Sequence, residues 1–188
     1  MRGWLLLVCG CGGQAAPCPR APYDCSNAHD VPVTIEIGTG DPDLAEWTPL
    51  PADGALELHD GPQGGYHVYL QARVRGLCPS AIEFSRTLRA PGDALVLRRQ
   101  MSLVRMVDDG DGSWIFPRAQ ATFVCPPEVS GVDMAGRALE VEALLTDVPG
   151  CHDDFDPRSG GATATIVPTC PEGDGKCASS AEAGCSAR

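Results

Sequence analysis

The stretch that decides the fold is residues 59–77, which read HDGPQGGYHVYLQARVRGL. Its first half contains Gly and Pro, which favour a turn, and its second half alternates apolar with polar residues. Successive side chains of a strand point to opposite faces, so this alternation predicts a strand with Leu70 buried and Gln71 exposed. The apolar face would contain Tyr66, Val68, Leu70, Ala72 and Val74, and the polar face His67, Tyr69, Gln71, Arg73 and Arg75. We therefore expect a half-buried antiparallel strand at the centre of a sheet.

Further strands are predicted on both sides of this one. Residues 108–112, DDGDG, favour a hairpin because Asp-Gly steps supply the positive φ of tight turns. Pro117 predicts a bulge or a sheet edge, since proline has no N–H to donate. Residues 136–147 also have helix propensity, but the period-two spacing of their apolar residues favours a strand. The other predicted strands are residues 31–38, 55–58, 81–88, 94–107, 113–124 and 161–167.

This pattern predicts an all-β fold, because seven or eight short strands alternate with turn signals and no convincing helix is present. The count and spacing favour an immunoglobulin-like antiparallel β-sandwich over a closed barrel, with a jelly roll as the alternative. A chain of 188 residues is expected to form one domain with tails. We expect a lipoprotein-type signal at 1–11, a tether at 12–30, the sandwich at 31–167 and a flexible Cys-rich tail at 168–188.

Ten cysteines in a chain of this length favour an oxidising compartment. No CxxC pair is present to indicate a zinc site, so disulfides that staple the sandwich are the better interpretation. If Cys11 is lipidated and Cys9 is removed, eight cysteines remain and allow four bridges of unknown connectivity. The candidates for disulfide bonds are Cys18, Cys25, Cys78, Cys125, Cys151, Cys170, Cys177 and Cys185.

The N-terminus resembles a bacterial lipoprotein signal. Arg2 precedes the short apolar run WLLLV, and Gly10 precedes Cys11. The resemblance implies that Cys11 is lipidated and that the protein contacts a membrane only through this anchor. The apolar run is shorter than the roughly 7–15 residues expected, so either translation starts upstream of Met1 or the signal is brief. The alternative is that Cys9 and Cys11 pair with other cysteines.

Residues 31–167 resemble uncharacterised bacterial secreted lipoproteins with an immunoglobulin-like domain. The resemblance rests on the turn and strand GPQGGYH at 61–67 and on the strand and turn at 136–150. It implies an exported protein of the cell envelope, in the outer membrane or periplasm. It identifies no functional residue.

Charge and motifs exclude several functions. A net charge of −11 with only 14 Lys and Arg argues against nucleic acid or anionic lipid as partner. The Ser residues lack a GxSxG frame, and residues 61–65 lack the Lys and helix start of a phosphate loop. We therefore expect no enzyme and no cofactor. The remaining interpretation is an envelope-anchored binding or structural domain whose partner is a protein or a carbohydrate.

A metal-binding exported domain is the alternative function. His59 and His67 flank the Gly-rich turn, and two histidines across a hairpin can share copper or zinc. Residues 152–156, HDDFD, are a second candidate for a hard cation. Residues 109–113, DGDGS, resemble the start of a calcium loop, but the sixth and twelfth positions are Trp114 and Gln120 instead of Gly and Glu. We interpret that segment as a hairpin turn.

Overall fold

The computed structural model describes residues 30–61, 65–79, 81–90, 96–124, 135–148, 158–175 and 177. The elements within these ranges are all strands, so the all-β prediction is confirmed. None of the described residues belongs to a helix that is long and apolar enough to cross a membrane.

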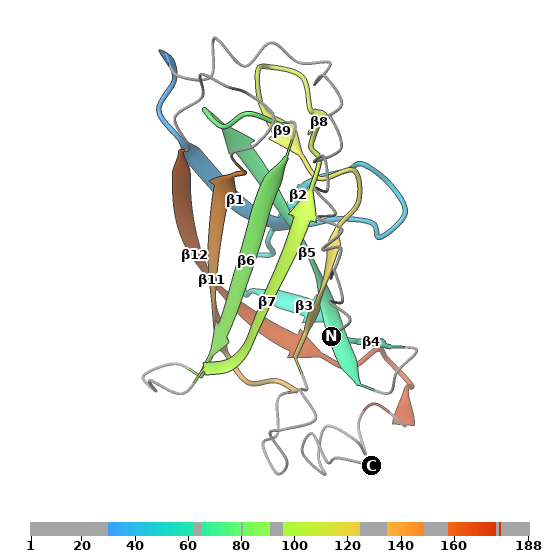
Figure 1. Ribbon diagram of the computed structural model, residues 1–188. Coiled ribbons are helices and arrows are strands. Elements are labelled where there is room, and N and C mark those ends of the chain that lie inside the picture. The colour runs from blue at the N-terminus through green and yellow to red at the C-terminus, as the bar shows by residue number, and fades with distance from the viewer. Residues whose placement is uncertain are drawn as a thin grey trace, which may run out of the picture.

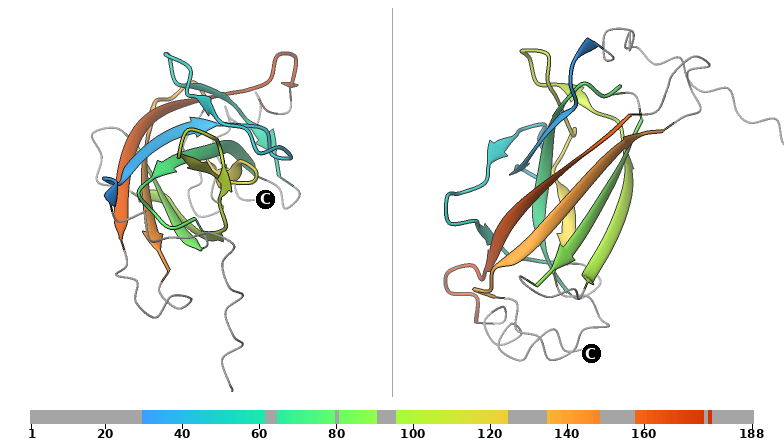
Figure 2. Two further views of the ribbon diagram at one scale, coloured as in Figure 1. Left: turned by 90° about the horizontal axis from the view of Figure 1, so that it is seen from above. Right: turned by 90° about the vertical axis from the view of Figure 1, so that its left-hand side faces the viewer.

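The strands form two curled sheets whose inner faces enclose the core (Figures 1 and 2). The first sheet has the order β2-β1-β5-β9-β8, and β4 and β10 also pair with β5. Its strands are β1 (Thr34–Thr39), β2 (Thr48–Pro49), β4 (His59–Asp60), β5 (Tyr66–Arg75), β8 (Val107–Asp108), β9 (Trp114–Ile115) and β10 (Gln120–Phe123). The second sheet, in the order β3-β12-β11-β6-β7, contains β3 (Ala55–Glu57), β6 (Ile82–Arg89), β7 (Val96–Val104), β11 (Leu139–Asp147) and β12 (Ser159–Thr169).

Each segment predicted to be a strand contains one in the structure. The strands that sequence did not predict are β2, β4 and β8, which have two residues each and are too short to produce an alternating pattern. β11 is a strand and not a helix, and its residues alternate between buried and exposed along its length. The expected hairpin at 108–112 joins β8 to β9, with Asp108 paired to Trp114.

The central position of β5 is confirmed, because it pairs with β1, β4, β9 and β10. The prediction that its polar face is exposed is wrong for His67 and Gln71, which are 5% and 0% exposed, whereas Arg73 and Arg75 are partly exposed. Residues outside the strands cover part of this face, since Gln71 donates to the carbonyls of Glu46 and Phe116.

Gln71 explains how this face is covered. Between β9 and β10 the chain leaves β5 at residues 116–119, at the predicted bulge around Pro117. The carboxamide of Gln71 occupies the gap: Nε2 donates to the Phe116 carbonyl at 3.0 Å, and Oε1 accepts from the Phe116 N–H at 3.0 Å. Nε2 also donates to the Glu46 carbonyl at 3.2 Å. The side chain thus pairs with the detached backbone as a neighbouring strand would.

Three of the cysteines predicted to form disulfide bonds lie within the described residues. Cys170 and Cys177 form a disulfide bond immediately after β12, and Cys78 is also disulfide-bonded. The remaining cysteines lie outside the described residues, as do the predicted signal and tether. They are Cys9, Cys11, Cys18, Cys25, Cys125, Cys151 and Cys185.

Candidate functional site

The two histidines proposed as metal ligands lie directly opposite each other. The antiparallel pairing of β4 with β5 places His59 across from His67, with ring centroids 6.0 Å apart. Both rings pack against Tyr69, at 4.8 and 4.9 Å between centroids, and His67 also packs against Phe123 at 5.7 Å. The sequence therefore predicted correctly that the two side chains lie close together, but not that His67 is buried.

Burial determines the protonation of His67. Desolvation lowers the pKa of His67 below its ordinary value of 6.5, the positive charge of His59 lowers it further, and Asp60 raises it in part. His67 is therefore neutral at pH 7, which is the form that binds metals. Its Nδ1 atom is buried and has no hydrogen-bond partner among the described residues.

The described residues provide no third metal ligand that completes a site with the pair. Within the described ranges, no group of three or more His, Cys, Asp or Glu side chains is arranged to hold a metal ion. The second candidate at 152–156 lies outside these ranges. The metal hypothesis for His59 and His67 stays a prediction with two ligands.

The acidic turn at 109–113 is paired with arginines of β5. Arg73 Nε lies 2.7 Å from a carboxylate oxygen of Asp109, and Arg75 Nη2 lies 2.8 Å from one of Asp111. The hydroxyl of Ser113 donates to Asp111 at 2.8 Å, and this bond is the main cause that lowers the pKa of Asp111. The guanidinium groups thus meet the carboxylates that a calcium ion would need, in agreement with a hairpin turn.

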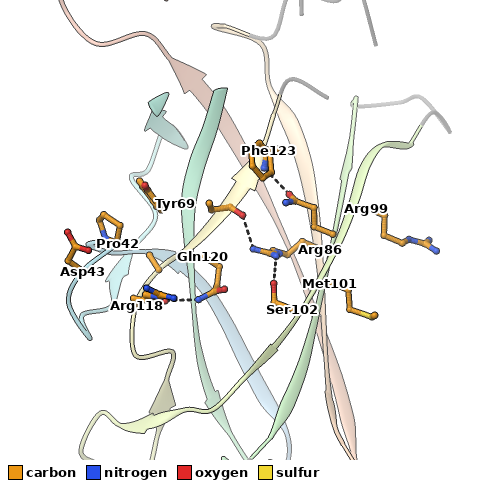
Figure 3. Close-up of a pocket in the computed structure, with 13 residues that line it drawn as sticks. Pro42, Asp43, Tyr69, Arg86, Arg99, Met101, Ser102, Arg118, Gln120 and Phe123 are labelled. Carbon is orange, nitrogen blue, oxygen red and sulfur yellow. Dashed lines mark hydrogen bonds between the residues drawn. The ribbon is translucent and has the colours of Figure 1, made fainter. Parts of the chain in front are cut away.

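The residues that could bind a ligand surround a pocket that the sequence did not predict. A cavity of about 690 Å³ lies between β6 and β7 of one sheet and β10 of the other (Figure 3). Three arginines and one aspartate line it, in a chain whose net charge is −11. In Figure 3, Arg86 lies in the middle of the pocket, Arg118 and Asp43 lie on its left-hand side, and Arg99 extends away from it.

Arg86 is the most unusual residue of this pocket. It occupies an inward position of β6, in the same phase as the buried Ile82, Phe84 and Leu88, and is 3% exposed. Its guanidinium lies over the ring of Phe84, with Cζ 4.7 Å from the centroid. A charged residue in the apolar phase of a strand was the signal in the sequence that could have identified it.

Hydrogen bonds hold the Arg86 guanidinium between the two sheets. Nη2 donates to the Ser102 hydroxyl at 2.7 Å, and Nη1 donates to the Ala121 carbonyl at 3.2 Å and to the Thr122 hydroxyl at 3.4 Å. The carbonyl of Ala121 belongs to the edge of β10 that faces β7. On the same edge the Phe123 N–H donates to Gln100 Oε1 at 2.8 Å. Between β7 and β10, hydrogen bonds from side chains thus take the place of the backbone hydrogen bonds that join paired strands.

The charge of Arg86 has no acidic partner among the described residues. Its Nε atom is buried and has no hydrogen-bond partner there. Desolvation lowers the pKa of Arg86 to about 10, so the guanidinium remains positively charged at pH 7. Buried charges in proteins are normally paired, because an uncompensated one costs several kcal/mol.

The pocket adjoins the histidine pair through two shared aromatic residues. Tyr69 and Phe123 line the pocket and also pack against His67. The polar cluster predicted from sequence and the pocket found in the structure are therefore neighbours.

Comparison of the chain with profiles of known protein families and with curated proteins found no match. The proposals for function therefore depend on the geometry described above.

Proposed function

We propose that this protein is a non-enzymatic binding domain whose ligand occupies the pocket beside Arg86. The observation that carries the proposal is the buried guanidinium of Arg86, which has no acidic partner among the described residues. A buried charge without a partner destabilises the fold, so it is seldom retained unless it has a function. Residues of this kind are therefore concentrated at binding and catalytic sites. The pocket also has a volume typical of small-molecule sites.

For the location, we propose that this binding domain is exported to the cell envelope, as expected from the sequence. We propose that Cys11 is lipidated and anchors the domain there. The Cys170–Cys177 disulfide and the disulfide-bonded Cys78 favour an oxidising compartment. Metabolic labelling with a fatty acid should mark the wild-type chain and not Cys11→Ala, and equal labelling of the two would contradict the anchor.

For the fold, we propose an immunoglobulin-like sandwich. The support is that two mainly antiparallel sheets pack against each other and enclose two hydrophobic clusters, and that both sheets contain long strands. Pairing of β3 with β12 is parallel and departs from a simple antiparallel arrangement. Of the two partner classes, a carbohydrate fits the pocket better than a protein, because amide, hydroxyl and guanidinium groups are the hydrogen-bonding groups around it.

A pocket-filling variant tests the proposed location. A panel of neutral sugars, acidic sugars and short peptides would be titrated into the full chain by calorimetry. Gln120→Trp should abolish the binding seen with wild type, because Gln120 lines the pocket, whereas Leu103→Trp should not, because Leu103 is 70% exposed outside it. Equal loss or equal binding in the two variants would contradict the location, and no binding to any member of the panel would contradict the function.

Metal binding at His59 and His67 is the second candidate function. It is favoured by the register that places the two side chains opposite each other and by the unpartnered Nδ1 of His67. Elemental analysis of protein purified without a chelator should then find copper or zinc, and His67→Ala should lose it. Absence of metal from the wild type would contradict this candidate and leave the pocket unaffected.

A further inference from the structure

We propose that the ligand of the Arg86 pocket is a carboxylate-bearing sugar, of the uronic acid class. This inference depends on the proposed binding function and names the ligand class for the same pocket.

The charge of the pocket is opposite to that of the whole chain. Among the described residues that line the pocket, Asp43 is the single acidic one, and it is exposed, while Arg86 and Arg118 are positive. Neither arginine forms an ion pair within the part of the chain that the structure describes. A ligand with a negative charge therefore supplies what the protein lacks at this position.

The donors that favour a planar oxyanion belong to Arg118. Its side chain is exposed at the left-hand side of the pocket (Figure 3), and its guanidinium forms no ion pair within the described residues. The Nε and Nη2 atoms of a guanidinium form the side that binds a carboxylate in a bidentate manner. Arg86 does not present this side, because its Nε atom is buried and its Nη1 and Nη2 atoms donate to Ala121, Thr122 and Ser102. Arg86 contributes its positive charge beside the site.

The rest of the pocket suits hydroxyl groups and a flat ring face. Gln100, Ser102 and Gln120 line it with amide and hydroxyl groups, and Tyr69 and Phe123 provide aromatic surface. Gln120 Nε2 bonds only to the nearby Arg118 carbonyl, at 3.0 Å in an exposed position, so a ligand hydroxyl can replace this bond. A bare inorganic anion would leave most of the 690 Å³ unfilled. A sugar that carries its own carboxylate fills the space and also meets the arginines.

Titration calorimetry on the full chain with three related sugars tests the ligand class. Glucuronate has the carboxylate, glucose lacks it, and glucose 6-phosphate carries a different oxyanion on a similar ring. We expect glucuronate to bind at least ten times more tightly than glucose and more tightly than glucose 6-phosphate. We also expect the affinity for glucuronate to fall as salt is raised from 50 to 500 mM, because the interaction is ionic.

Matched arginine variants test whether the proposed residues provide the affinity. Arg118→Gln should weaken glucuronate binding at least tenfold, whereas Arg105→Gln, which removes an exposed arginine outside the pocket, should leave it within twofold. Arg118→Lys keeps the charge but loses the fork, and should weaken the binding of glucuronate more than that of glucose 6-phosphate.

Each result that differs from these expectations contradicts one part of the proposal. If glucose binds as well as glucuronate and Gln120→Trp abolishes both, the carboxylate class is wrong and the binding function stands. If glucose 6-phosphate is preferred, the oxyanion is a phosphate and the uronic acid class is wrong. Equal effects of Arg118→Gln and Arg105→Gln would remove the proposed contact. If none of the three sugars binds but a peptide of the wider panel does, the sugar class alone is wrong.

Discussion

Gln71→Met is the substitution that tests the architecture most directly. Methionine has nearly the shape of glutamine but cannot form the hydrogen bonds by which Gln71 pairs with residues 116–119. The variant leaves the Phe116 N–H and carbonyl without partners in a position that is fully buried. A buried polar group without a partner costs about 1–3 kcal/mol.

The expected loss follows from these two orphaned groups. Since two groups lose their partners, Gln71→Met should lower the free energy of unfolding by about 2–6 kcal/mol, before the bond to the Glu46 carbonyl is counted. Gln71→Ala should cost more, because it adds a cavity. Urea denaturation followed by far-UV circular dichroism, with disulfides intact, measures both values.

Gln120→Met is the matched control for this experiment. Gln120 also lies between β5 and the pocket, but its amide makes one exposed bond to the Arg118 carbonyl, so its loss should cost under about 0.5 kcal/mol. A cost of less than about 1 kcal/mol for Gln71→Met, or equal costs for the two variants, would refute the reasoning that the Gln71 carboxamide replaces a strand.

Three further predictions follow from the core, the histidine pair and the disulfide. Leu70→Ala should cost about 2–5 kcal/mol in the same urea assay, since Leu70 is fully buried, and a cost below about 1 kcal/mol would contradict its place in the core. The lowered pKa of His67 means that the unfolded chain, with its ordinary value of 6.5, takes up the proton first as pH falls. The contribution of His67 to the free energy of unfolding is therefore complete above pH 6.5 and is lost as the pH falls toward the lowered pKa of the folded state. If the free energy of unfolding of His67→Gln changed between pH 7 and 5 as steeply as that of the wild type, the lowered pKa would be contradicted. Cys177→Ser opens a short disulfide loop to Cys170 and should cost about 2.5 kcal/mol on the loop-entropy estimate, and an unchanged urea midpoint would contradict a structural role for this bond.

Local alternation was enough to locate the long strands of this fold. The buried and exposed residues of β11 alternate along the strand, so a pattern of period two identified it despite the helix propensity of its Ala, Leu and Glu. Hairpin chemistry in the same way located the turn between β8 and β9, and the Gly-rich turn placed His59 near His67. These features depend on neighbours in sequence.

The burial of β5 and the Arg86 pocket depend on contacts between distant segments. Gln71 is covered by residues 25 and 45 positions away, so its polar character alone gave the wrong prediction of exposure. Arg86 is held by Ala121, 35 positions away. Its inward phase could be read from β6, but no local pattern shows that β10 of the other sheet lies beside it and that a pocket opens there. β7 and β10 belong to different sheets, and they meet only because both sheets curl.

The parallel pairing of β3 with β12 has a consequence for how the chain folds. β3 lies early in the sequence, but the strand it pairs with in the second sheet is β12. The Thr169 hydroxyl donates to the Leu56 carbonyl across 113 positions. Closing so long a segment is slow, because the entropy of the loop is lost before the contacts form. The second sheet can therefore be completed only after almost the whole domain has been synthesised. A chain that stays open until its last strand arrives can cross a membrane before it folds.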